Sequence, residues 1–335
     1  MTSKDISVLL SDSSFLVNVD ERDRTIWRIV VTVVAGVLVG IVAVFATFAV
    51  IGAGFIFTAK SLAVGATDFG AFMQSLSTAD GHDLGQAILL LLMPTLANGP
   101  LVLTFIVLAA ALSHHRMRDY LTSAPQFRWR LLVAGMVMSM LAIGPLLGLD
   151  ALVSGDANPL PVLTVSKTFQ GRALYTACAI VLLIPAAMIE EVLFRGWMLR
   201  QTAAFQKNPI FLMVFTGLAF SAVHLDFNPD AFIARTIMGA GFAYMTLRLG
   251  GLEFSTGAHA ANNILIVIFL EPLTLKAPAV TGGMSMASVV QDVLLAAGYV
   301  LITEAVARIP WLRRWTEVRD EELSGGTAQP AALFG

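Results

Sequence analysis

Three short clusters of polar residues interrupt otherwise apolar stretches of this chain, at residues 190–196, 220–224 and 259–263. Ionisable groups inside apolar spans are costly, so they are treated as candidates for a functional site. Glutamate can act as a general base, and imidazole can hold a water, bind a metal or stabilise an oxyanion. A carboxamide can donate a hydrogen bond to an oxyanion. A carboxylate, two imidazoles and a carboxamide are together the parts of a site that activates water for hydrolysis.

The first cluster contains two acids and a base within seven residues. On a helix that turns about 100° per residue, Glu191 and Arg195 lie on one face, and Glu before Arg at this spacing is the favourable order. Glu190 points about 100° away from Glu191, so it has another partner or is itself the working group. We therefore predict that Glu191 and Arg195 support the site while Glu190 carries the chemistry. The alternative is that both acids are solubilising charges at a helix end.

Each of the other two clusters pairs a histidine with a residue four positions away, on the same helix face. Phe220 pairs with His224, and His259 pairs with Asn263 across small residues. Taken alone, such a histidine is more often a satisfied core residue, and such an asparagine can simply hold helices together. The three clusters together are more informative, because the remaining histidines all fall in predicted connections: His82, His114 and His115.

The composition indicates an integral membrane protein. Of 335 residues, 57% are hydrophobic and 13% are charged, where soluble domains carry about 25% charged residues. The mean hydropathy is +0.78. The net charge of −2 gives no reason to expect a nucleic-acid partner. The single cysteine, Cys178, lies in an apolar run, which excludes a disulfide framework and a cysteine-rich metal site.

Eight stretches are long and apolar enough to be candidate spans, since a span needs about 20 apolar residues. The chain is therefore predicted to be an all-α, polytopic bundle of about eight transmembrane helices. Pro94, Asn98 and Pro100 predict a kink in the second helix. The acidic, then Gly- and Ala-rich tail after Arg319 is expected to be disordered. The predicted spans are residues 29–59, 86–113, 131–149, 173–199, 209–225, 231–247, 254–270 and 287–309.

The basic residues predict the orientation. Both termini and the connections on their side carry 16 of the 21 Lys and Arg residues, and the other side carries 5. If Arg195 is counted inside its helix, the asymmetry is 15 to 5. The positive-inside rule then places both termini in the cytoplasm, with the bilayer of a bacterial inner membrane as the expected location. No internal repeat is evident, which argues against a transporter built from repeats.

One conflict arises from these boundaries. Glu190 falls toward the cytoplasmic half of its span, whereas His224 falls near the opposite end of its own. For the two side chains to meet, the fourth span must be a long tilted helix that runs past Arg200, or the fifth span must lie elsewhere.

The three clusters, in this order, resemble the motifs of the CPBP family of intramembrane proteases. This family contains prenyl-protein (CAAX) endopeptidases and relatives of bacteriocin-immunity proteins. Its pattern is Glu-Glu-x-x-x-Arg, then Phe-x-x-x-His, then His-x-x-x-Asn, and every motif position is matched here. The resemblance covers about residues 172–309, less than half of the chain. It implies a catalytic core at 172–309. The predicted spans and orientation add a cytoplasmic segment at 1–28, additional spans at 29–171 that match none of the family's motifs, and a cytoplasmic, disordered tail at 310–335.

The resemblance implies peptide-bond hydrolysis in or near the membrane, on a membrane-associated peptide or a prenylated protein. In one mechanism, Glu190 and His224 activate a water while His259 and Asn263 hold the oxyanion, with Phe220 in support. In the other, Glu190, His224 and His259 bind zinc and leave a position open for water. The sequence lacks His-Glu-x-x-His, the commonest zinc-protease signature, which favours the metal-free mechanism.

The sequence is also compatible with two other functions. The first is a catalytically silent membrane scaffold or a bacteriocin self-immunity protein that keeps the fold. A complete motif set argues against it, since a scaffold has no need of all these groups. The second is a transporter that uses the same buried acids, against which the missing repeats and the clustering in one half of the chain both argue.

Overall fold

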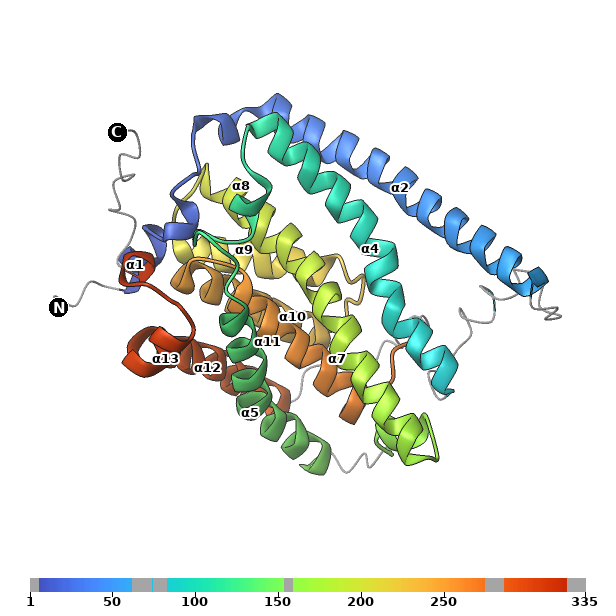
Figure 1. Cartoon of the computed structure of the whole chain (residues 1–335). Helices are drawn as coiled ribbons and strands as arrows, with labels where there is room; N and C mark the ends of the chain where they lie inside the picture. Colours follow the sequence, from blue (N-terminus) through green and yellow to red (C-terminus); the bar gives the residue numbers. More distant parts are fainter. Residues whose placement is uncertain (1–5, 62–73, 75–82, 154–158, 275–285, 324–335) are drawn as a thin grey trace.

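The computed structural model describes residues 6–61, 74, 83–153, 159–274 and 286–323, and within these ranges it contains helices and no β-strand. The prediction of an all-α, polytopic bundle is confirmed. Figure 1 shows the helices lying side by side, several of them tilted against one another. The long helices are α2 (Ile26–Ser61), α4 (Leu84–Ser113), α5 (Trp129–Val153), α7 (Phe169–Glu191), α9 (Pro209–Ala222), α10 (Pro229–Leu249), α11 (Glu253–Leu265) and α12 (Met286–Arg308).

Short helical segments connect and extend these elements. They are α1 (Ile6–Ser11), η1 (Ser14–Leu16), η2 (Glu21–Arg24), η3 (Met117–Tyr120), α6 (Pro161–Thr164), η4 (Val192–Met198), α8 (Leu199–Ala203), η5 (Ile266–Leu270), α13 (Pro310–Trp315) and α14 (Asp320–Leu323). The segments η4 and η5 are π-helical, and such segments are frequent at functional sites. Each follows directly on a helix that carries motif residues, α7 and α11.

Five helices are long and apolar enough to cross a membrane: Ile26–Gly54, Leu84–Ser113, Trp129–Leu146, Phe169–Ala203 and Met286–Arg308. They correspond to five of the eight predicted spans. The other three predicted spans correspond to α9, which is apolar but has only 14 residues, to α10, and to α11 with η5. The helix that precedes His224, α9, and the helix that carries His259, α11, are therefore among those that do not meet this length and composition criterion.

The conflict over the depth of Glu190 is resolved by the length of its helix. The segments α7, η4 and α8 continue into one another, so that a single helix runs from Phe169 to Ala203 and past Arg200. Glu190 consequently lies well inside this helix. Of the two explanations offered by the sequence, the long fourth helix is the one found.

Glycines allow the motif-bearing helices to approach their neighbours closely. A Cβ atom on Gly257 of α11 would lie 2.0 Å from the carbonyl oxygen of Leu132 in α5. A Cβ atom on Gly217 of α9 would lie 2.4 Å from the carbonyl oxygen of Thr236 in α10. Small residues at such crossings are typical of helix packing in membranes, where backbones approach without a hydrophobic driving force. These crossings fix α9, which ends just before His224, and α11, which carries His259.

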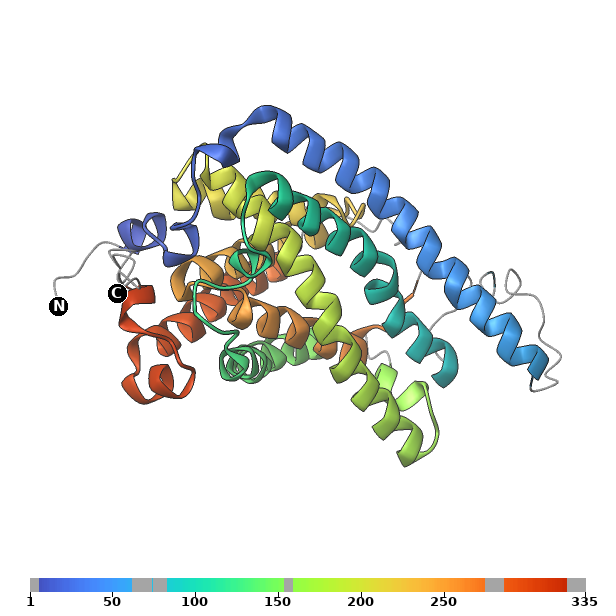
Figure 2. The same ribbon diagram turned by 45° about the horizontal axis from the view of Figure 1, so that its top comes forward.

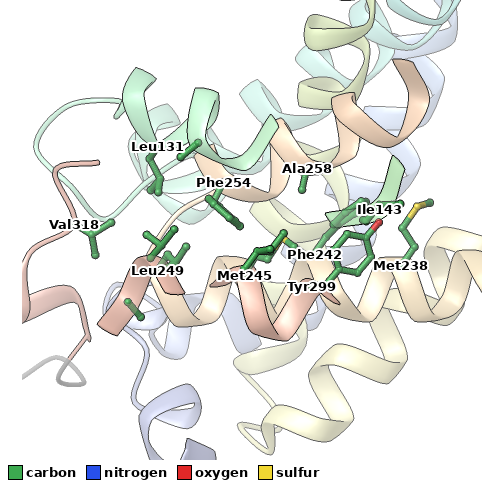
Figure 3. Packing of buried hydrophobic residues seen from close by; sticks show 14 of the residues in the cluster. Leu131, Ile143, Met238, Phe242, Met245, Leu249, Phe254, Ala258, Tyr299 and Val318 are labelled. Atoms are coloured by element: carbon green, nitrogen blue, oxygen red, sulfur yellow. The ribbon is translucent and has the colours of Figure 1, made fainter. Parts of the chain in front are cut away.

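Four helices share one apolar core. Figure 3 shows side chains of α5, α10, α11 and α12 gathered together, and all of those in this paragraph are buried. Phe242 of α10 packs against Tyr299 of α12, with ring centroids 5.3 Å apart. The same cluster contains Leu131, Met245 and Phe254. It supports the faces of α10 and α11 that the candidate site uses.

The N-terminal segment, several connections and the C-terminal helices meet at one end of the bundle, as Figures 1 and 2 show. Buried Arg128 bridges two acids there, with nitrogen–oxygen distances of 2.8 Å to Glu253 and 2.6 Å to Glu322. Burial by itself would lower the pKa of Arg128, but the attraction and hydrogen bonds of Glu253, with the attraction of Glu322, raise it above its usual value. The start of α11 is thereby tied to the C-terminal helix α14.

The expectation of a disordered tail is wrong for residues 310–323. This segment forms α13 and α14, and it buries Leu312, Val318 and Glu322. The physical reason is the pairing of Glu322 with Arg128, a contact between residues 194 positions apart in sequence. Local composition does not reveal such a contact. Residues 324–335 lie outside the described ranges.

Candidate active site

The four residues predicted to be catalytic line one cavity. Glu190 comes from α7, His224 from the turn after α9, and His259 and Asn263 from α11. The cavity has a volume of about 670 Å³ and also touches α4 and α10. Most of its other lining residues are apolar, among them Leu101, Leu183, Phe194, Met238 and Ile266. Two helices and the turn after a third therefore bring a carboxylate, two imidazoles and a carboxamide to one apolar space.

His259 is held firmly in this space. Its Nδ1 atom lies 3.0 Å from Oε1 of Glu191, and its Nε2 atom lies 3.6 Å from Oε2 of Glu190. One face of its ring stacks on Phe242, with centroids 5.0 Å apart and planes 23° apart, and Phe220 meets it edge-on at 5.4 Å. These contacts fix the plane of the imidazole and direct Nε2 toward the cavity.

The contacts of His259 also indicate where its protons lie. An ionised carboxylate only accepts hydrogen bonds, so Nδ1 of His259 donates to Glu191. Nε2 lies 3.6 Å from the Glu190 carboxylate and faces the cavity, where its N–H can donate a hydrogen bond when the atom carries a proton.

Glu191 and Arg195 lie behind the cavity and form an ion pair. Nη1 of Arg195 lies 2.8 Å from Oε1 of Glu191, and neither side chain has any exposed surface. Nη2 of Arg195 donates to the carbonyl oxygen of Gly239 at 2.8 Å. The guanidinium also packs against the faces of Phe220 at 4.7 Å and Phe242 at 5.3 Å. Because Glu191 bonds both Arg195 and His259, the pair connects α7 to the imidazole of α11.

Phe220 is the common neighbour of the charged groups. Its buried ring lies 4.8 Å from the ring of His224 and 5.3 Å from that of Phe194, in addition to its contacts with His259 and Arg195. The sequence gives Phe220 as a helical partner of His224 and as a supporting residue of the site. In the structure it separates the Arg195 guanidinium from the cavity and orients both histidines.

His224 lies just beyond the end of α9. Its Nδ1 atom is 2.7 Å from the carbonyl oxygen of Phe220. A carbonyl only accepts, so Nδ1 carries the proton, and Nε2 of a neutral His224 has a free lone pair. The next residue, Leu225, has a φ of 54°, which is uncommon for a non-glycine residue. The turn is held by an ion pair of 2.8 Å between Asp226 and Arg235.

Several residues at the cavity were not identified from the sequence. Phe242 and Gly239 contribute a ring face and a carbonyl oxygen, and neither has a chemical signature in sequence. Asn262 lines the cavity beside Asn263, and the spacing rule from His259 selected only the latter. Arg235 and Asn98 also line it. Asn98 carries one signal in sequence, a polar residue inside an apolar span, but its position between Pro94 and Pro100 predicts only a kink.

The residues proposed as zinc ligands do not fit a zinc site in this arrangement. Zinc bonds to nitrogen and oxygen are about 2.0–2.2 Å long, so three ligand atoms must lie close together. Glu190, His224 and His259 do not form a group whose ligand atoms all lie within 4.8 Å of one another. Within the described residues, the group that does so lies outside the cavity, where its members already form ion pairs: Asp20, Asp23 and His115.

Comparison with known proteins agrees with the motifs. Residues 172–265 match the family described as type II CAAX prenyl endopeptidase Rce1-like. This range contains every residue of the three motifs, and the match confirms the resemblance to the CPBP proteases. Over 161 residues the chain is 28% identical to the uncharacterized protein YyaK of Bacillus subtilis (strain 168), across 46% of this chain and 52% of that protein. The chain thus spans about half the length of this relative, and no solved structure matches.

Proposed function

We propose that this protein is an intramembrane endopeptidase that hydrolyses peptide bonds of membrane-associated substrates. One observation carries the proposal: Glu190, His224, His259 and Asn263 line a single cavity within a bundle of apolar helices. A folded scaffold has no need to gather these four groups around an open space. The match to the type II CAAX prenyl endopeptidase family over residues 172–265 supports the same reaction class.

The reaction we propose uses the chain's own groups throughout. Glu190 and His224 hold a water between them, and its proton passes to Nε2 of His224 or to the Glu190 carboxylate as its oxygen attacks the scissile carbonyl carbon. The carbonyl oxygen becomes an oxyanion, which accepts hydrogen bonds from Nε2–H of His259 and from the Asn263 carboxamide. When the C–N bond breaks, the stored proton passes to the leaving amine. Glu191 keeps the His259 ring in place through Nδ1.

The substrates we propose are apolar peptide segments or prenylated proteins that reach the cavity from the bilayer. The apolar lining suits an apolar chain or side chain, and the polar groups are few and gathered at the reacting end, as is usual for a specific pocket. We also propose that residues 172–309 form the catalytic core. Residues 29–171 supply additional spans, of which α4 forms one wall of the cavity.

The test uses the full-length protein in lipid nanodiscs and a panel of internally quenched peptides. The panel contains unmodified apolar decapeptides and peptides that carry a farnesylated cysteine near a free C-terminus. We expect the parent and the Glu271→Gln variant to cleave at least one peptide, because Glu271 is an exposed acid outside the cavity lining. Glu190→Gln should leave the same peptide intact. Equal cleavage by Glu190→Gln and parent would refute the proposal, and a panel untouched by the parent would favour the scaffold.

Metal removal gives a second expected outcome. Treating the parent with 1,10-phenanthroline should leave the rate of peptide cleavage unchanged, because the cavity residues do not gather into a zinc site and the water is activated by side chains. The measurement is the initial rate before and after treatment. A rate that falls and then returns when zinc is added would replace this mechanism with the metal-dependent one.

We propose, finally, that both termini face the cytoplasm. The basic residues favour this side by 16 to 5, and several connections that carry them share an end of the bundle with α1 and α13. Contacts between them include hydrogen bonds from Arg200 to the Phe15 carbonyl oxygen and from Ser123 to that of Gly250. A reporter that is active only in the cytoplasm is expected to be active when it is fused after Arg319. A reporter that is active only after export is expected to be inactive there. Activity of an exported reporter at that position would reverse the orientation.

A further inference from the structure

Asn98 is a polar side chain on the cavity that the proposed chemistry does not use. It lies in α4, an otherwise strongly apolar helix with Pro94 and Pro100 in its interior. Its side chain is exposed and lines the cavity that also contains Glu190. Among the residues that the structure describes, its carboxamide has no hydrogen-bond partner. An unpaired carboxamide in a membrane-spanning helix costs free energy, so its presence on the cavity wall calls for a ligand.

Asn98 lies at about the same level along the bundle as Glu190. A Cβ atom on the neighbouring Gly99 would lie 3.3 Å from Cδ1 of Ile189, the residue that precedes Glu190. The helices α4 and α7 are therefore in contact at this level. Asn98 lines the cavity from α4, and His259 and Asn263 line the same cavity from α11. A peptide lying across the catalytic groups would pass this carboxamide.

The chemistry of an asparagine side chain suits the main chain of a peptide. Each residue of an extended substrate brings one N–H and one C=O group into the cavity, and without water each of them needs a partner. A carboxamide offers both donors and an acceptor, so it can bind an N–H and a C=O of the same extended chain. Apolar cavity walls cannot supply these bonds.

The other polar lining groups are less suited to this role. Arg235 is already bonded to Asp226 at 2.8 Å, and Asn262 is buried. Glu190, His224, His259 and Asn263 act on the scissile bond itself in the proposed reaction. Asn98 is the exposed carboxamide that remains on the lining, and it comes from outside the matched range of residues 172–265.

We propose that Asn98 binds the main chain of the substrate and holds it in extended form against the catalytic residues. This inference rests on the proposed peptidase function, and it extends the site to α4. Helix α4, which the sequence places among the additional spans outside the catalytic core, is then part of the substrate-binding surface. The residue acts on binding, through two hydrogen bonds to peptide groups, and takes no part in the proton transfers.

The first arm of the test is kinetic, in nanodiscs, with a peptide that the panel shows to be cleaved. Asn98→Leu should raise KM by about tenfold, which is the loss of two ordinary hydrogen bonds, and should change kcat by less than about threefold. Asn98→Gln keeps the carboxamide and should recover part of the loss. Thr104→Val is the matched control on the same helix, because Thr104 bonds the carbonyl of Pro100 in its own helix and lies outside the cavity lining.

The second arm separates binding from a structural role. If Asn98 held helices together, Asn98→Leu would lower the thermal unfolding midpoint. If it is an unpaired group awaiting a peptide, the midpoint should stay the same or rise while KM rises. An unchanged KM, or a lower midpoint with a proportionate loss of all activity, would overturn the inference.

The third arm keeps this inference distinct from the proposed function. Binding of fluorescently labelled, apolar decapeptides is measured in a Glu190→Gln background, where no cleavage is expected. Adding Asn98→Leu should raise the Kd of the best-bound peptide by about tenfold. That result would support Asn98 even if the parent cleaved nothing and the peptidase proposal failed. Unchanged Kd values, or no peptide bound by the parent, would count against the Asn98 site.

Discussion

Replacing Glu190 by Gln is expected to lower kcat by about 10²–10⁴-fold, the range typical of losing a general base. The substitution keeps the size of the side chain and removes its charge. Glu190 is 21% exposed on the cavity and lies 3.6 Å from Nε2 of His259. It has no arginine or lysine partner among the described residues, so we expect the variant to fold as the parent does. The measurement is kcat in nanodiscs, with the thermal unfolding midpoint recorded alongside.

The same experiment tests whether the four cavity residues act as a unit. His224→Ala, His259→Ala and Asn263→Ala should each cost most of the activity. Combining any of them with Glu190→Gln should cost little more, because residues that serve one transition state are not additive. Independent, multiplicative losses would contradict a shared site. Glu271→Gln remains the matched control, and it should keep the activity of the parent.

The motif residues could be predicted because their chemistry and helical spacing are both local in sequence. The i,i+4 rule that paired Glu191 with Arg195 corresponds to a contact of 2.8 Å in the structure. The prediction that Glu190 points elsewhere is matched by its place on the cavity lining, from which Glu191 is absent. Hydropathy predicted the five long apolar helices for the same reason, since crossing a bilayer requires a continuous run of mostly apolar residues.

What the sequence did not reveal depends on contacts between distant residues. Glu191 bonds His259, 68 positions away, and Glu322 bonds Arg128, 194 positions away. Neither contact follows from periodicity or composition. The fourth helix, predicted at residues 173–199, extends four residues further at each end, from Phe169 to Ala203. A buried ion pair let that helix continue through the polar cluster.

Arg195→Ala is expected to destabilise the protein by roughly 3–5 kcal/mol, because it leaves the Glu191 carboxylate buried without its counter-ion. Both side chains are fully buried, so water cannot replace the lost guanidinium. The substitution also removes the bond to the Gly239 carbonyl and the packing against Phe220. The measurement is unfolding in detergent, by denaturant titration of parent and variant. Arg308→Ala is the matched control, since Arg308 forms an exposed i,i+4 pair with Glu304 and its loss should change little.

A double replacement separates the structural role of this pair from its role at the site. Glu191→Gln combined with Arg195→Met removes both charges and keeps most of the volume, and it should regain much of the stability lost in Arg195→Ala. It should not regain activity, because Nδ1 of His259 would then face an amide in place of the carboxylate that holds the ring in position. An Arg195→Ala protein that is as stable as the parent yet inactive would instead give Arg195 a part in the chemistry. A double variant with full activity would show that Glu191 serves the fold alone.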